Sequence, residues 1–399
     1  MTPLMSTERL LVRLREFRRL LRDQKMHLYR VGIILFATLG YVAILLFPVL
    51  LLTSTFSIYQ EFFLRESIAW HSVSIWLAIA IISGLVSYRL TQYKRPPLEG
   101  LRLAEDKAPE LFNQIEQLES CFKRSVIDQV VITSNYQLDI GKIPRTAFPA
   151  ATLNTLIIGL PVLHCLNATQ FERLLARRLI QFFKRDNLVT LWLSQRRVVW
   201  QQYRLGYAAQ KGFGTEPLAW FFSLYSPLYS SLSLQVARQS ELNADFCAME
   251  LYNDEQVREM ITADAVCRHY LKIRYWPAVD KIAAMNTATT PTPHKKMATA
   301  MNANFSGDKL AMFIEETFDA ESDQDDPAPS LRDRIYNIGH DRPRMEQADA
   351  PAAATHYLGA YNENITALID KLWLKSRLAN RQRRQRDPTP TETLPLNSS

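Results

Sequence analysis

The segment TQFERLLARRLIQFFKRD, residues 169–186, decides how the rest of the chain is interpreted. Glu172 follows Thr169 at the spacing of a capping box, which predicts a helix beginning at that threonine. The apolar residues then recur every three or four positions, as on one face of an α-helix. They are Phe171, Leu174, Leu175, Leu179, Phe182 and Phe183.

Three polar residues, Arg177, Arg178 and Gln181, occupy the other side of this predicted helix. Arg177 and Gln181 are four residues apart and project in the same direction, with Arg178 one position further round. By pattern alone, an ordinary amphipathic helix with a solvated arginine face fits as well as a functional one.

Composition indicates a folded chain of one large or two smaller domains. The 399 residues are 47% hydrophobic and include only 12 Gly and 20 Pro, which is not typical of a disordered protein. The formal net charge of +7 is concentrated at the two ends. The four cysteines form no C-x-x-C pair, so we interpret them as buried thiols in a reducing compartment.

Two apolar runs near the N-terminus predict membrane-spanning helices. No charged residue lies between Arg30 and Glu61, and residues 31–53 and 68–88 each reach the ~20 residues that a bilayer requires. A pair of buried core helices is the alternative. A cleaved signal peptide is disfavoured, because the first run is long, has no A-x-A site and precedes a second span.

The basic residues around these spans predict their orientation. Residues 1–30 carry eight Lys or Arg, and four more follow the second span, whereas the connecting loop 54–67 has only Arg65. The positive-inside rule then places both termini in the cytoplasm and the loop outside. The basic segment 1–30 is also amphipathic, which suits either a helix on anionic lipid headgroups or a simple topology flank.

Residues 96–378 are expected to form an α+β, helix-rich cytoplasmic domain with a small sheet. Residues 128–134 and 153–159 are predicted strands, with a loop containing Gly141 and Pro144 between them. The remaining periodic segments predict helices, the last over residues 353–378. The charge-free segment 217–237 could form a third span, but its Pro227 and hydroxyls favour a helix packed in the domain or on the membrane surface.

The C-terminal residues 379–399 are expected to be a basic stretch followed by a disordered tail. Their arginines could contact either lipid headgroups or nucleic acid. Two neighbouring membrane spans make anionic lipid the simpler partner, so no nucleic acid is expected.

Five segments of the chain resemble the membrane-anchored zinc metallopeptidases related to the heat-shock protease HtpX and the CAAX prenyl proteases. They are YRLTQYKRPPLEGLRLAEDKAPELF (88–112), LNTLIIGLPVL (153–163), LNATQFERLLARRL (166–179), ARQSELNADFCA (237–248) and PSLRDRI (329–335). The resemblance implies a zincin-like fold of the gluzincin type, in which an edge strand precedes an H-E-x-x-H helix and a helix with E-x-x-x-D. For a bacterial source it also implies the inner membrane and protein quality control.

The chain departs from this family at the zinc site. In the family motif two His bind zinc, Glu is the general base, and a later Glu is the third ligand. Glu241 and Asp245 match the E-x-x-x-D positions, but Arg177, Arg178 and Gln181 stand where the motif has His, Glu and His. Ala328 also replaces a family-like His. A guanidinium has no lone pair for a metal and accepts no proton from water.

An arginine at position 177 has a specific electrostatic consequence. Without zinc, Glu241 would be an uncompensated and partly buried anion, which is costly. We therefore expect Arg177 to pair with Glu241, and Arg178 or Gln181 to lie near Asp245 as a lesser contact. A separation of Arg177 and Glu241 beyond ~6 Å would contradict this expectation.

These observations predict a membrane-anchored pseudopeptidase that binds a protein or peptide partner in its groove, with the strand near Thr155 as an edge for β-augmentation. No catalytic residue, cofactor or metal is expected. The alternative is a zinc metalloendopeptidase with a displaced site, in which Glu241 remains a ligand. His164 with Cys165, or Cys267 with His269, could supply other ligands. A purely structural membrane protein is the third interpretation.

Overall fold

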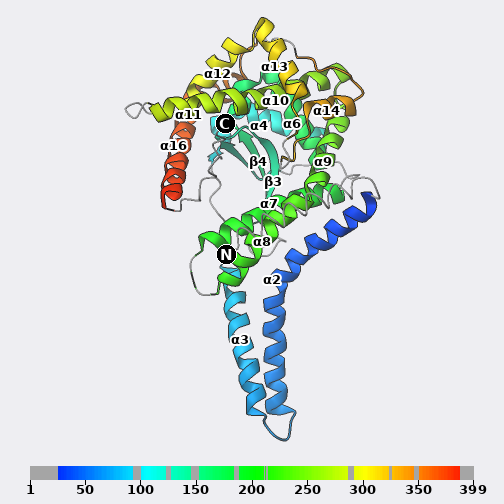
Figure 1. The fold of residues 1–399 in the computed structure, drawn as a ribbon, viewed down its shortest axis with the longest axis vertical. Coiled ribbons are helices and arrows are strands. Elements are labelled where there is room, and N and C mark those ends of the chain that lie inside the picture. The colour runs from blue at the N-terminus through cyan, green and yellow to red at the C-terminus, as the bar shows by residue number, and fades with distance from the viewer. Residues whose placement is uncertain are drawn as a thin grey trace, which may run out of the picture.

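The protein has a helix-rich α+β fold with a small mixed four-stranded sheet and two long apolar helices near the N-terminus (Figure 1). A computed structural model describes residues 26–92, 100–122, 127–144, 152–183, 188–210, 212, 214–285, 292–322, 326–345 and 350–386. The predicted amphipathic segment before residue 26, most of the linker after the second apolar helix and the end of the polar tail lie outside these residues.

The two apolar helices, α2 (Met26–Phe63) and α3 (Trp70–Thr91), form an antiparallel pair that projects from the rest of the molecule (Figure 1). Both are long and apolar enough to cross a membrane. Helix α2 continues to Phe63, ten residues past the expected end of the first span. At 38 residues it is about 57 Å long, which exceeds the ~30 Å bilayer core.

The N-terminal part of α2 packs against two further helices, α7 (Leu188–Ala209) and α8 (Glu216–Leu232). Trp200 of α7 is fully buried at their junction. Gly40 permits the close approach, since a Cβ there would lie 2.9 Å from the Trp200 ring. The apolar segment after residue 216 is therefore a helix packed on α2 and α7, as its proline and hydroxyls indicated, and it ends at Leu232.

The sheet contains β1 (Leu101–Leu103), β2 (Gln129–Thr133), β3 (Leu138–Pro144) and β4 (Thr152–Gly159) in the order β1-β2-β4-β3. The two predicted strands are present as β2 and β4. The predicted loop around Gly141 was wrong, because Leu138 to Pro144 pair antiparallel with β4 and bury Leu138 and Ile140. Gly141 and Pro144 are uncommon in strands, so the sequence pattern of this segment indicated a loop.

Thr155 cannot serve as a β-augmentation edge. It lies in the middle of β4, where it is fully buried and pairs with Gln129 of β2 on one side and Gly141 of β3 on the other. A strand with two neighbours has no backbone groups left for a third. The outer strands of the described sheet are β1 and β3.

Helices cover the sheet and complete the domain (Figure 1). They are α4 (Pro109–Cys121), α5 (Leu160–Cys165), α6 (Ala168–Phe183), α9 (Leu234–Ala248), α10 (Asp254–Tyr270), α11 (Trp276–Met285), α12 (Pro293–Asn304), α13 (Gly307–Asp319), α14 (Leu331–Asn337), α15 (Ala353–Leu358) and α16 (Asn362–Arg386). The final predicted helix is divided at Gly359, whose φ of 48° favours glycine. Helix α16 then continues past residue 378, into the stretch that was predicted to be a tail.

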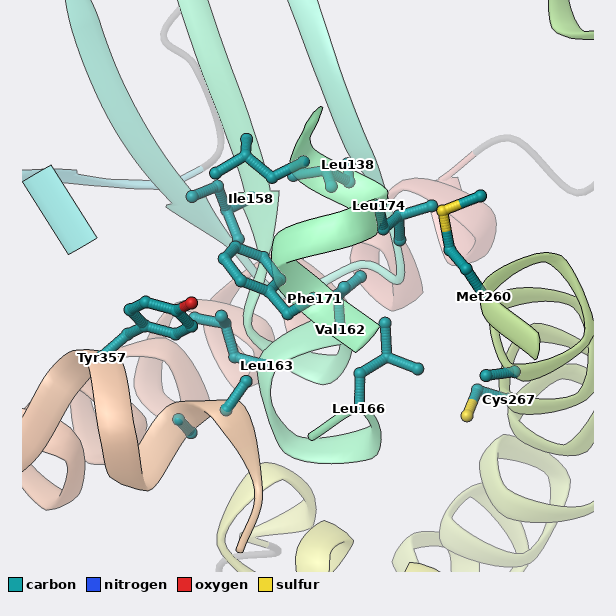
Figure 2. Close-up of a cluster of buried hydrophobic side chains, with 14 of the residues drawn as sticks. Leu138, Ile158, Val162, Leu163, Leu166, Phe171, Leu174, Met260, Cys267 and Tyr357 are labelled. Atoms are coloured by element: carbon teal, nitrogen blue, oxygen red, sulfur yellow. The ribbon is translucent and has the colours of Figure 1, made fainter. Parts of the chain in front are cut away.

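Helix α6 is the central helix of this core (Figure 2). Its Phe171 and Leu174 face β-strand residues on one side, and the Phe171 ring lies 5.1 Å from that of Tyr357. The expected cap at Thr169 was wrong by two residues, because the helix begins at Ala168. Asn167 and Gln170 form the reciprocal cap instead, each side chain accepting a hydrogen bond from the other residue's backbone N–H.

Candidate functional site

The polar side of α6 faces α9, and the five residues singled out in the sequence meet there. Arg177, Arg178 and Gln181 come from α6, and Glu241 and Asp245 come from α9. The apolar face of α6 determines this placement. With Phe171, Leu174 and Leu175 buried in the core, the opposite side must point toward the neighbouring helix.

Arg177 bridges both carboxylates of α9. Its Nη2 donates to Glu241 Oε2 at 2.9 Å, and its Nε donates to Asp245 Oδ1 at 2.5 Å. The side chains of Arg177 and Asp245 are fully buried. The expected pair between Arg177 and Glu241 is thus confirmed, and Arg177 also takes the contact with Asp245 that was expected of its neighbours.

Arg178 and Gln181 bind Glu241 and not Asp245, so the expected lesser contact was wrong. Arg178 Nη1 donates to Glu241 Oε1 at 2.5 Å, and Gln181 Nε2 donates to the Ser240 hydroxyl at 3.0 Å and to Glu241 at 3.4 Å. The reason is geometric: Arg177 points deeper into the helix interface, and the other two remain at its rim with Glu241.

A third arginine, Arg334 of α14, completes the network. Its Nε donates to Asp245 Oδ2 at 2.8 Å, and its Nη1 donates to Asp264 Oδ2 of α10 at 3.1 Å. Arg334 and Asp264 are both buried. Sequence reasoning did not single out either residue, although Arg334 lies in the quoted PSLRDRI segment. We call Arg177, Arg178, Arg334, Glu241, Asp245 and Asp264 the arginine–carboxylate network.

The network lowers the pKa of two of its carboxyl groups, Glu241 and Asp264. Burial alone would raise the pKa of Glu241, but Arg178 and Arg177 outweigh it and hold that pKa well below its ordinary value. Burial likewise opposes ionisation of Asp264, while Arg268 and Arg334 lower its pKa to about 2. The network therefore joins α6, α9, α10 and α14 through paired guanidinium and carboxylate groups, and Arg268 of α10 adds a fourth guanidinium 3.4 Å from Asp264.

These residues do not fit a zinc ion. Both oxygens of Glu241 accept hydrogen bonds from arginine, and Arg177 and Gln181 present a guanidinium and an amide to it. A zinc site needs at least three donors with free lone pairs, whereas every carboxylate of this cluster is already bound by arginine.

The other His and Cys pairs named from the sequence do not form ligand sets. His164 Nε2 lies 3.4 Å from the Thr366 hydroxyl, and Cys267 Sγ faces the carbonyl oxygen of Cys165 at 3.7 Å. His269 lies 3.6 Å from Glu316 at the surface. Within the described ranges, no three His, Cys, Asp or Glu residues are arranged to hold a metal ion.

A cavity of about 140 Å³ lies beside the network. Its walls come from β3, α6, α7 and α9, and include Asp139, Lys142, Arg178, Gln195 and Glu241. Helix α7 packs along β3 and closes one side of it. The cavity is thus where the edge strand, the arginine helix and the carboxylate helix meet, and the arrangement can bind a ligand without offering it a metal-bound nucleophile.

Comparison with known proteins adds no identification: no family model, curated protein or solved structure matches this chain.

Proposed function

We propose that this protein is a membrane-anchored pseudopeptidase: a zincin-like, HtpX-like domain that binds protein segments and does not hydrolyse them. The observation that carries the proposal is Arg177, which is fully buried between Glu241 and Asp245, at the position that the family resemblance assigns to a metal-binding His. A cation held by two carboxylates satisfies the site electrostatically and leaves no base or Lewis acid for hydrolysis.

The order of elements supports the zincin-like interpretation. Edge strand β3 runs next to the α6 helix, and α9 supplies Glu241 and Asp245 one helical turn apart, as the family pattern requires. The proposed binding site is the cavity between them, with β3 in place of the strand near Thr155.

Membrane anchoring completes the proposal. Helices α2 and α3 are each long and apolar enough to span a bilayer, and the basic residues that flank them favour a cytoplasmic domain. The binding cavity would then be attached to the inner face of a membrane, where it could hold membrane or newly released protein segments.

The test uses the full-length protein in lipid nanodiscs and fluorescein-labelled β-casein as an unfolded protein. We expect casein to bind and to remain uncleaved with or without added zinc. Val198→Trp places an indole in the cavity wall and should reduce binding about tenfold, since it fills the site. Val189→Trp, at an exposed position of the same helix, is the matched control.

Two outcomes would contradict the proposal. Zinc-dependent casein cleavage, abolished by Glu241→Gln, would show a working peptidase. Casein binding that ignores Val198→Trp, or no casein binding at all, would remove the cavity as a site for unfolded protein segments.

A further inference from the structure

The four cysteines are free thiols, and they differ in their surroundings. Cys121 is exposed, so the expectation that it would be buried was wrong, whereas Cys247 and Cys267 are buried. Cys165 is half-buried at the C-terminal end of α5. It meets Cys267 of α10, which lies 102 residues further along the chain. Cys165 and Cys267 are therefore a pair that only the fold brings together.

The two side chains of this pair are in contact between α5 and α10. The Cys267 thiol lies 3.7 Å from the carbonyl oxygen of Cys165, and it also makes a hydrogen bond with the Cys165 side chain. In Figure 2 the Cys267 sulfur points from α10 toward the turn that carries Leu166, the residue after Cys165. Two thiols in contact need side-chain rotation, and not a movement of helices, to reach the ~2 Å of an S–S bond.

A shared neighbour agrees with this placement. Burial and Asp264 raise the pKa of Tyr136, and the thiol groups of Cys267 and Cys165 both add to that rise. Both sulfurs therefore lie near one and the same hydroxyl group.

The two thiols differ in their access to solvent. Cys165 lines a cavity of about 440 Å³ between α5, the start of α6, α12 and α13, whose walls also include Asn167, Gln170 and Met301. Cys267 has no exposed surface. Burial, with the hydrogen bond to Cys165, raises the pKa of Cys267, which keeps it protonated at neutral pH. A small oxidant that enters the cavity therefore meets Cys165 first.

We propose that Cys165 and Cys267 are a redox-active pair that hydrogen peroxide converts to a disulfide bond. The Cys165 sulfur loses its proton and attacks one peroxide oxygen. The O–O bond breaks, which gives a sulfenic acid and a hydroxide that takes up the proton as water. The Cys267 sulfur then attacks the sulfenic sulfur, the S–S bond forms, and the S–O bond breaks. The departing hydroxide takes the Cys267 proton as a second water, so the two thiols lose two electrons and the peroxide gains them.

The disulfide would fix α10 against α5, close to the arginine–carboxylate network. Asp264 lies one turn before Cys267 on α10, and its carboxylate accepts hydrogen bonds from Tyr136 at 3.2 Å and Arg334 at 3.1 Å. The S–S bond would also close a loop between residues 102 positions apart, which restricts the unfolded chain. Oxidation should therefore stabilise the folded protein, whether or not it binds unfolded segments.

The experiment treats the full-length protein in nanodiscs with hydrogen peroxide, alkylates the remaining thiols with N-ethylmaleimide after denaturation, and analyses the peptides by mass spectrometry. We expect the peptides that carry Cys165 and Cys267 to be joined, while Cys121 and Cys247 are alkylated. Dithiothreitol should return all four thiols to the alkylated form. The midpoint of thermal unfolding should rise by about 5–10 °C on oxidation, because the closed loop is long.

Three substitutions separate the roles of the two thiols. Cys165→Ser and Cys267→Ser should each abolish the joined peptide and the rise in the thermal midpoint. In Cys267→Ser the sulfenic acid of Cys165 should accumulate and react with dimedone, because the second thiol is missing. Cys121→Ser, at an exposed position of α4, is the matched control and should preserve both the joined peptide and the rise.

Each remaining outcome overturns the redox-active pair. Oxidation of Cys121 alone, or of no cysteine, would show that the cavity does not make Cys165 reactive. Dimedone labelling of Cys165 in the natural protein, without a joined peptide, would show that the two sulfurs do not meet. A joined peptide with a lowered thermal midpoint would show that the fold must distort to form the bond. Casein binding is measured separately, so none of these results decides the pseudopeptidase proposal.

Discussion

The neighbouring helices α6 and α7 both bury arginine, and they do so in opposite ways. On α6, Arg177 meets two carboxylates from α9 and has no exposed side-chain surface. On α7, Arg196 is also buried, but its Nη1 donates to the Tyr41 hydroxyl at 2.6 Å and its guanidinium lies 5.7 Å from the Trp192 ring. Arg196 has no carboxylate partner in the described part of the chain.

The comparison shows that the fold depends on the charge of Arg177, whereas it only accommodates the charge of Arg196. Without Arg177, Asp245 would keep only Arg334 as an ion-pair partner among the described residues, and its side chain has no exposed surface at which water could replace the lost guanidinium. The partners of Arg196 are neutral, and they remain satisfied or easily hydrated when the guanidinium is removed. The arginine–carboxylate network therefore consists of mutually dependent buried charges, whereas Arg196 contributes packing and a hydrogen bond to a neutral hydroxyl.

The largest effect is expected from Arg177→Met. This substitution leaves Asp245 fully buried with one arginine fewer, and such broken buried pairs cost about 3–5 kcal/mol. The free energy of unfolding, from guanidinium titration in detergent micelles, should fall by that amount. A loss below ~1 kcal/mol would mean that the carboxylates are not dependent on Arg177.

The second effect is a pH dependence that belongs to the network. Folding lowers the pKa of Asp264 from 3.8 to about 2, so its contribution of roughly 2 kcal/mol is present above pH 5 and is lost as the pH falls toward 2. Glu241 shifts in the same direction. The free energy of unfolding should fall between pH 5 and pH 2.5, and Asp264→Asn should make that fall shallower. An unchanged slope in Asp264→Asn would assign the acid sensitivity to other groups.

Arg196→Met should have a smaller effect than Arg177→Met. It removes one hydrogen bond to a neutral hydroxyl and one cation–π contact, which together contribute about 1–2 kcal/mol. The same guanidinium titration measures it. If this substitution cost as much as Arg177→Met, the contrast between α6 and α7 would be lost.

The smallest effect is expected from Arg332→Met in α14. Arg332 pairs with Asp319 at 2.7 Å, but both side chains are exposed to solvent, at 45% and 75%. Exposed ion pairs typically contribute ~0–1 kcal/mol. The free energy of unfolding should change by less than ~1 kcal/mol. This variant therefore serves as the control for the effect of replacing any arginine by methionine.

The sequence was informative where a pattern is local. The apolar runs gave α2 and α3, the β-branched runs gave β2 and β4, and the three-to-four spacing gave the buried face of α6. The pair between Arg177 and Glu241 was also predictable, because a partly buried carboxylate on one helix needs an opposite charge from the helix that faces it.

What the sequence did not reveal depends on tertiary contacts. Strand β3 has a glycine and ends in a proline, and only its pairing with β4 makes it a strand. Arg334 and Asp264 enter the network from two further helices, so no spacing within one segment relates them to Asp245. The helix cap is Asn167 and not the predicted Thr169. The side chains of Asn167 and Gln170 each accept a hydrogen bond from the other residue's backbone N–H, and this pair fixes the start of the helix.

Metal analysis of the purified full-length protein tests the central claim most directly. The protein should be purified without chelators in the presence of micromolar zinc and analysed by mass spectrometry for metal per chain, alongside Glu241→Gln. The arginine–carboxylate network predicts far less than one zinc per chain in both proteins. One zinc per chain in the natural protein, lost in Glu241→Gln, would contradict it and show that Glu241 is a metal ligand.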